Sequence, residues 1–227
     1  MGILEDLPIM PVNSVLFPFA PTSLYIHEQR YREMLDERLE TGGGVFGLSL
    51  LKAGQEVGGL GIPHEVGTIA RIIAVTKLPD QSSLVMARGG PRFRIRRITE
   101  LRPLVEAQVD ILEDSSEMSR AEQLLADEAR QELQVLLALL LETMDAGELE
   151  VDVPEDPVKL SWAVAAHVQA SLAVQQELLE SSSVAARLEV TLPMLREEVS
   201  HYRVMQAARQ RLDELGLPDD DAPFSRN

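Results

Sequence analysis

Apolar and polar residues alternate in short runs along the first half of the chain, and turn-forming residues separate the runs. Such runs predict a series of short β-strands, whose order and short turns favour an antiparallel sheet closed, or nearly closed, into a small barrel. The runs are Leu7–Val12, Ser23–Ile26, Val45–Leu51, Val66–Leu78, Ser83–Arg88, Arg92–Thr99 and Pro103–Leu112. Glu28–Glu40 instead carries apolar residues at helical spacing and predicts one amphipathic helix. Lys52–Glu65 is rich in turn residues and predicts a loop.

The second half has the denser leucine pattern of helices. Four helices are expected, beginning near Ser119, at Asp156-Pro157, at Ala173 and at Ser181-Ser182-Ser183. Ser119 and Glu122 have the spacing of a capping box, and Asp156 is an N-cap residue followed by proline. The last helix contains Pro193, which predicts a kink because proline removes one backbone hydrogen bond.

These patterns predict an α+β protein with two modules of different kind. Residues 1–113 are expected to form the antiparallel β-barrel with its one helix. Residues 114–218 are expected to form an α-helical bundle, and residues 219–227 an acidic tail.

Charge is divided unevenly between these modules. The chain has 227 residues and a formal net charge of −16, of which residues 1–113 carry −2 and residues 114–227 carry −14. So acidic a chain argues against nucleic acid or an anionic membrane surface as partner. The chain lacks cysteine, which excludes disulfides, thiolate metal sites and cysteine nucleophiles. No apolar run is long enough to span a bilayer and no signal-peptide pattern is present, so we expect a cytoplasmic protein without a membrane anchor.

The usual catalytic and cofactor motifs are missing or misplaced. Gly42–Gly47 matches G-x-G-x-x-G in form, but it follows a helix and enters a strand, the reverse of a dinucleotide site. No lysine follows a glycine, which excludes a P-loop, and Gly-x-Ser-x-Gly is absent. The four histidines form no metal-binding pair. We therefore expect no cofactor, no metal and no catalytic residue.

One basic cluster remains. Arg92, Arg94 and Arg96 alternate with Phe93 and Ile95, so one strand face is cationic and the other apolar. This stripe is interpreted either as an anion or RNA contact, or as an outer face of the barrel paired with acids of the helical half. We favour the second interpretation, because the chain as a whole is strongly negative.

Four segments, in order along the chain, resemble the N-terminal domain of the Lon ATP-dependent proteases. Leu7–Pro18 is a proline-spaced strand ending in Leu-Phe-Pro, and Leu24–Met34 is similar to that domain's next strand and helix. Gly67–Asp80 resembles its central strand, and Arg92–Ile95 its Arg-Phe-Arg-Ile strand. The helical half is similar more loosely, for instance at Asp156-Pro157. The resemblance implies a PUA-like β-barrel followed by a helical bundle.

The chain departs from that family at His27, Gln29 and Phe19, where other residues are usual. It also ends before the ATPase and Ser-Lys protease modules of a whole Lon protease could begin, so we expect the stand-alone, non-catalytic form.

The resemblance implies a polypeptide-binding module that takes unfolded or partner proteins without ATP. The candidate contacts are apolar residues near the junction of barrel and helices, with Phe19 the best candidate for exposure: Leu16, Phe17, Phe19, Tyr25 and Tyr31. Two alternatives stay open, namely RNA binding through the arginine stripe and service as an adaptor for a separate protease. The pattern leaves the oligomeric state undetermined.

Overall fold

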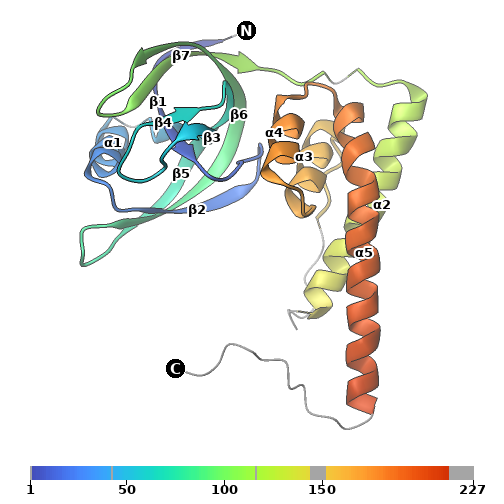
Figure 1. Cartoon of the computed structure of the whole chain (residues 1–227). Helices are drawn as coiled ribbons and strands as arrows, with labels where there is room; N and C mark the ends of the chain where they lie inside the picture. Colours follow the sequence, from blue (N-terminus) through green and yellow to red (C-terminus); the bar gives the residue numbers. More distant parts are fainter. Residues whose placement is uncertain (1, 42, 116, 144–151, 215–227) are drawn as a thin grey trace.

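The computed structural model describes residues 2–41, 43–115, 117–143 and 152–214 and places a β-rich module beside a helical one (Figure 1). The strands are β1 (Ile3–Val12), β2 (Pro21–Ile26), β3 (Val45–Gly54), β4 (Gly61–Pro63), β5 (Val66–Lys77), β6 (Ser83–Glu100) and β7 (Val105–Leu112). The helices are α1 (Gln29–Glu40), α2 (Arg120–Thr143), α3 (Pro157–His167), α4 (Leu172–Glu180) and α5 (Val184–Glu214). The α+β class is therefore confirmed. The expected acidic tail, 219–227, lies outside the described residues.

The sheet closes on itself. Its strand order is β1-β7-β6-β5-β3-β4, and β1 pairs additionally with β3, so the hydrogen-bonded path returns to the strand where it began. The pairings are antiparallel, as expected, except that β1 and β3 run parallel over Ile9–Val12. The helix α1 places Tyr31, Met34 and Leu35 in the core enclosed by these strands. The domain boundary expected at residues 113 and 114 stays a prediction.

Two strand predictions are wrong in part. The stretch Lys52–Glu65 is not all loop, because β3 extends to Gly54 and pairs with the short strand β4. The break expected between Arg88 and Arg92 does not occur, and β6 is one continuous strand. The backbone of Gly89 forms hydrogen bonds with the loop after β1. A Cβ on this glycine would lie 2.1 Å from the carbonyl oxygen of Phe17. Glycine here permits a close backbone approach and does not end the strand.

The helices begin as their sequence signals predict. The backbone N–H of Ser119 donates to the Glu122 carboxylate and the N–H of Glu122 to the Ser119 hydroxyl, which makes the capping box. Asp156 accepts from the backbone N–H of Lys159 at the start of α3. The long helices α2 and α5 lie side by side and, with α3, enclose a leucine-rich core (Figure 1). The short α4 contacts β5, so it joins the helical module to the sheet.

Candidate functional site

A buried apolar cluster joins the two modules. Phe17, in the loop after β1, stacks on Trp162 of α3 with 5.8 Å between ring centroids. Phe17 is 4% exposed and Trp162 is fully buried. Val66 of β5 and Leu178 and Leu179 of α4 complete the cluster. This junction is packed like a core, so the side chain of Phe17 packs inside it and does not face solvent.

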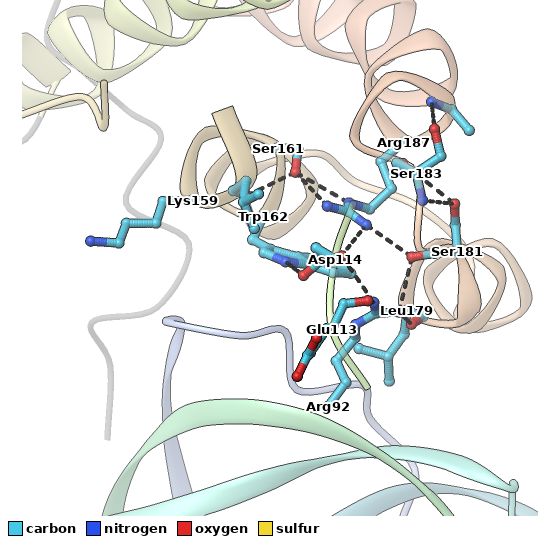
Figure 2. A network of polar contacts seen from close by, with 12 residues as sticks. Arg92, Glu113, Asp114, Lys159, Ser161, Trp162, Leu179, Ser181, Ser183 and Arg187 are labelled. Carbon is cyan, nitrogen blue, oxygen red and sulfur yellow. Dashed lines mark hydrogen bonds and ion pairs between the residues drawn. The ribbon is translucent and has the colours of Figure 1, made fainter. Parts of the chain in front are cut away.

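Two arginines from different modules meet beside this cluster (Figure 2). Arg92 of β6 and Arg187 of α5 are both buried, and both donate to Oδ1 of Asp114, at 2.9 Å and 2.7 Å. Trp162 donates its indole N–H to Oδ2 of the same carboxylate at 3.1 Å. The guanidinium of Arg187 also lies 3.8 Å from the centroid of the Trp162 ring. A sheet strand, two helices and the segment between the modules are therefore tied at one point.

One carboxylate faces two guanidiniums, so other acceptors complete the network. Arg92 donates to the carbonyl oxygens of Leu179 and Ser181, and Arg187 donates to Ser181 and to the hydroxyl of Ser161 (Figure 2). Leu179 and Ser181 lie at the C-terminal end of α4, the negative pole of that helix, which favours nearby cations. The network thus provides acceptors for both buried guanidiniums, although Nε of Arg92 has none, and it fixes α4 against the sheet.

Burial sets the pKa values of both arginines. It lowers the pKa of Arg187 to about 10, against the opposing effect of Asp114. Burial lowers the pKa of Arg92 as well, again opposed by Asp114. Both guanidiniums are still charged at neutral pH, so the cluster holds an excess positive charge that depends on Asp114 and the helix carbonyls.

The arginine stripe is therefore not one exposed cationic face. Arg92 is buried under the helical module, while Arg94 and Arg96 are exposed. Arg96 forms an ion pair with Asp110 of the neighbouring strand β7. For Arg92 the structure matches the interpretation favoured above, an outer sheet face packed against the helical half and paired with an acid.

The five apolar candidates are also divided by burial. Leu16, Phe17 and Tyr31 are buried, whereas Phe19 is 48% exposed and Tyr25 is 56% exposed. Phe19 has a φ of +66°, which a bulky residue rarely adopts, and its N–H donates to the carbonyl of Gly89 at 2.8 Å. The backbone therefore holds the Phe19 ring at the surface at a cost in strain, and its role in binding stays a prediction.

Tyr25 belongs to an apolar surface that the sequence analysis did not identify. Tyr25 of β2 is the direct partner of Leu84 in β6, and Met86 follows on the same face two residues later. Ile73 is the extra residue of a bulge in β5, beside Ala74, which is the direct partner of Met86. Leu84, Met86 and Ile73 are 43%, 50% and 59% exposed. We call these four residues the outer apolar face.

A signal for this surface was present in the sequence. In Ser83–Arg88 the residues Leu84 to Ala87 are apolar without alternation. A strand with one face in water alternates, so an unbroken apolar run indicates that both faces meet apolar partners. In the structure Val85 and Ala87 fill the core, while Leu84 and Met86 face outward and are 43% and 50% exposed.

A groove adjoins the outer apolar face at the edge of β2. It lies between residues 10–12 of β1 and residues 23–27 around β2, and its volume is about 170 Å³. Buried Tyr31 contributes to its lining, and Glu28, Glu56 and Val57 line it as well. Burial raises the pKa of Tyr31, Arg30 opposes the rise, and Glu28 and Glu56 add to it. We call this cavity the β2 groove.

Two negative findings apply to the described residues. Across residues 2–41, 43–115, 117–143 and 152–214, no group of three or more His, Asp or Glu side chains is arranged to hold a metal ion. Within the same ranges no helix is both long and apolar enough to cross a membrane.

Comparison with known proteins identifies the family. Residues 6–197 match the profile of the ATP-dependent protease La (LON) substrate-binding domain. The chain is 24% identical over 208 residues to the Lon protease of Escherichia coli K12 and 26% identical over 219 residues to that of Desulfovibrio desulfuricans. These alignments cover 91% and 93% of this chain but only 26% and 25% of the relatives, so the chain spans about a quarter of their length.

Solved structures agree. The crystal structure of a Lon N-terminal domain protein from Xanthomonas campestris has a TM-score of 0.63 and 27% identity, covering 84% of this chain and 98% of that one. The N-terminal domain of the Mycobacterium avium complex Lon protease has a TM-score of 0.60 at 20% identity, covering 86% and 98%, and supports the fold alone. The matched segments include β1, the sheet, the junction and most of the helical module, and this chain belongs to the Lon substrate-binding domain family.

Proposed function

We propose that this chain is a non-catalytic polypeptide-binding module, which recognises apolar segments of unfolded or partner proteins without ATP. The observation that carries the proposal is the outer apolar face, defined above by Tyr25, Ile73, Leu84 and Met86. Four large apolar side chains, each at least 43% exposed, lie together on one sheet surface. Contiguous apolar surface of this kind is typical of protein interaction sites. The matched family is named for substrate binding, which supports the same assignment.

Charge supports this proposal over RNA binding. Of the three arginines that would carry an RNA contact, Arg92 is buried and Arg96 is paired with Asp110. The net charge of −16 repels phosphates and would also keep a protein with an exposed apolar face in solution.

The test is suppression of aggregation. α-Lactalbumin aggregates when its disulfides are reduced, and reductant leaves the present chain unchanged because it contains no cysteine. We expect the purified chain to slow light scattering equally with and without ATP. Met86→Gln should weaken this effect, whereas the matched variant Met205→Gln should not, since Met205 is equally exposed but lies on α5. Equal activity of both variants would place client binding elsewhere on the molecule.

A further inference from the structure

One edge of β2 has no strand partner among the described residues. Beyond its pairing with β6, no strand pairs with β2 there. On the opposite wall of the β2 groove, β1 pairs with β7 only as far as Ile9, and with β3 over Ile9–Val12. Among the residues that the structure describes, residues 10–12 of β1 therefore also have no strand partner on one side. The groove lies between two open strand edges.

Antiparallel geometry identifies the backbone groups that face this groove. The N–H of Gly89 donates to the carbonyl of Ala20 at 2.8 Å, the bond that flanks a non-hydrogen-bonded pair at Pro21 and Arg88. Because bonded and non-bonded pairs alternate, Thr22, Leu24 and Ile26 are bonded to β6. The N–H and C=O groups of Ser23 and Tyr25 therefore point to the open edge.

We infer that the β2 edge binds client polypeptide by strand addition, with the Ser23 and Tyr25 backbone groups pairing to an extended segment of alternating apolar residues and a flanking cation. This inference rests on the proposed function and specifies how that surface takes its client. Exposed edges with open donors and acceptors are templates for an added strand. A natural edge is usually protected by lysine or a bulge, and β2 has only Pro21 at its start.

Side chains of the added strand would find a place on both faces. Those on the outer side would lie next to Tyr25 and extend the row that Tyr25 forms with Leu84. Those on the inner side would enter the β2 groove. Its volume of about 170 Å³ is below the roughly 300 Å³ of small-molecule sites, so it suits side chains better than a metabolite.

Charge around the groove specifies the flanking cation. Glu28 and Glu56 line it, and Asp80 accepts a hydrogen bond from the Tyr25 hydroxyl at 3.1 Å. Hydrogen bonds from Ser82, with a smaller effect of Tyr25, lower the pKa of Asp80 and keep this carboxylate ionised. Arg30 forms an ion pair of 3.0 Å with Glu28. The remaining negative charge is complementary to lysine or arginine beside the apolar segment.

The test measures binding of the labelled peptide Lys-Val-Thr-Val-Tyr-Val-Thr-Lys by fluorescence anisotropy. Ser23→Pro removes the N–H that faces the open edge and leaves the bonds to β6 intact, and Ser23→Ala is the matched control that keeps this N–H. We expect Ser23→Pro to bind about tenfold more weakly than the native chain, and Ser23→Ala to bind as the native chain does. Circular dichroism and thermal unfolding check that both variants fold.

Modified peptides provide a test that does not depend on folding of the variant. In one analogue every second backbone nitrogen is methylated, and in the other analogue the remaining set is methylated. Only one set faces β2 in an added strand, so at least one analogue should bind about tenfold more weakly than the parent peptide. A peptide with glutamate in place of both lysines should also bind more weakly, and equal binding would contradict the cationic flank. Protection from hydrogen exchange should appear at the Ser23 and Tyr25 amides when the parent peptide is added.

The outcomes separate this inference from the proposed function. If Ser23→Pro and both methylated peptides behave as their parents, strand addition is wrong while client binding stands. If the native chain suppresses aggregation but binds no peptide, strand addition is again wrong. If it does neither, the proposed function fails with it. Should Ser23→Pro convert a dimer to a monomer while the native chain binds no peptide, a second copy occupies the edge and the inference is overturned.

Discussion

Arg92 and Arg187, one from the sheet and one from the last helix, share a single oxygen of Asp114 at 2.9 Å and 2.7 Å. Neither arginine is exposed, so both depend on this carboxylate and on nearby carbonyls for their charge. The arrangement makes the junction of the two modules a fixed part of the fold, which holds β2, β6 and the surface between them in one position.

Loss of the shared carboxylate should destabilise the whole chain. Asp114→Asn leaves two buried guanidiniums without a counter-charge, and we expect it to lower the free energy of unfolding by about 3–5 kcal/mol. The matched variant Asp36→Asn breaks the exposed pair with Lys77 and should cost less than about 1 kcal/mol. Urea unfolding followed by circular dichroism measures both, and similar losses would show that the network is not a main support of the junction.

Two phenylalanines of one loop should behave in opposite ways. Phe17→Ala removes a ring buried against Trp162 and should cost about 3–5 kcal/mol, whereas exposed Phe19→Ala should leave stability nearly unchanged. The chain has one tryptophan, so its fluorescence reports directly on the junction. In Phe17→Ala the emission should shift to the red. In Phe19→Ala we expect native emission together with weaker suppression of client aggregation.

Glu106 should make stability depend on pH. Burial, Glu100 and Asp6 raise the pKa of this carboxyl above its usual 4.5, while Arg38 opposes them. The folded state then binds the proton more tightly than the unfolded state, so stability falls as pH rises from about 4.5 through the folded pKa. Glu106→Gln removes this fall and should be more stable than the native chain at pH 7, by less than about 1 kcal/mol. Unfolding curves of both proteins at pH 4 and pH 7 measure this effect. The assignment would be contradicted if the difference in free energy of unfolding between the two proteins were the same at both pH values.

Gly89 should not accept a side chain. A Cβ at this position would meet the Phe17 carbonyl oxygen at 2.1 Å, and backbone atoms there cannot move aside without disturbing the junction. We expect Gly89→Ala to lower the melting temperature strongly, while Gly43→Ala, which meets nothing within 4 Å, should not. Comparable melting temperatures for the two variants would mean that the loop after β1 can withdraw from β6.

Local signals in the sequence were sufficient for the helices and for most strands. Residues such as Asp156 and Ser119 specify helix starts through bonds to their own neighbours, so their role is visible in the sequence. The strand break predicted at Gly89 was wrong because glycine occurs both in turns and where two backbones approach closely. Only the tertiary contact with Phe17 distinguishes the two cases. The alternation of Arg92 and Phe93 correctly placed their side chains on opposite faces of the strand. The helix that covers Arg92 lies 87 residues further along the chain, so the local sequence does not show it.

The binding surface was predictable only in part. Tyr25 was identified because its segment resembles the family, and Phe19 because it lies between two prolines. Both residues are exposed. The other members of the outer apolar face depend on register, since Leu84 meets Tyr25 only because β2 and β6 pair as they do. Strand register is set by tertiary pairing, which a single sequence does not display.

The central claim is that the outer apolar face contacts client polypeptide, and site-specific photo-crosslinking tests it most directly. A photoreactive amino acid would replace Leu84 on this face or, as control, Val190 on α5, which is exposed to a similar extent. On irradiation with reduced α-lactalbumin, we predict a crosslinked product from position 84 and little from position 190, with native α-lactalbumin giving none at either. Equal crosslinking at both positions, or none at position 84 while aggregation is still suppressed, would contradict the assignment.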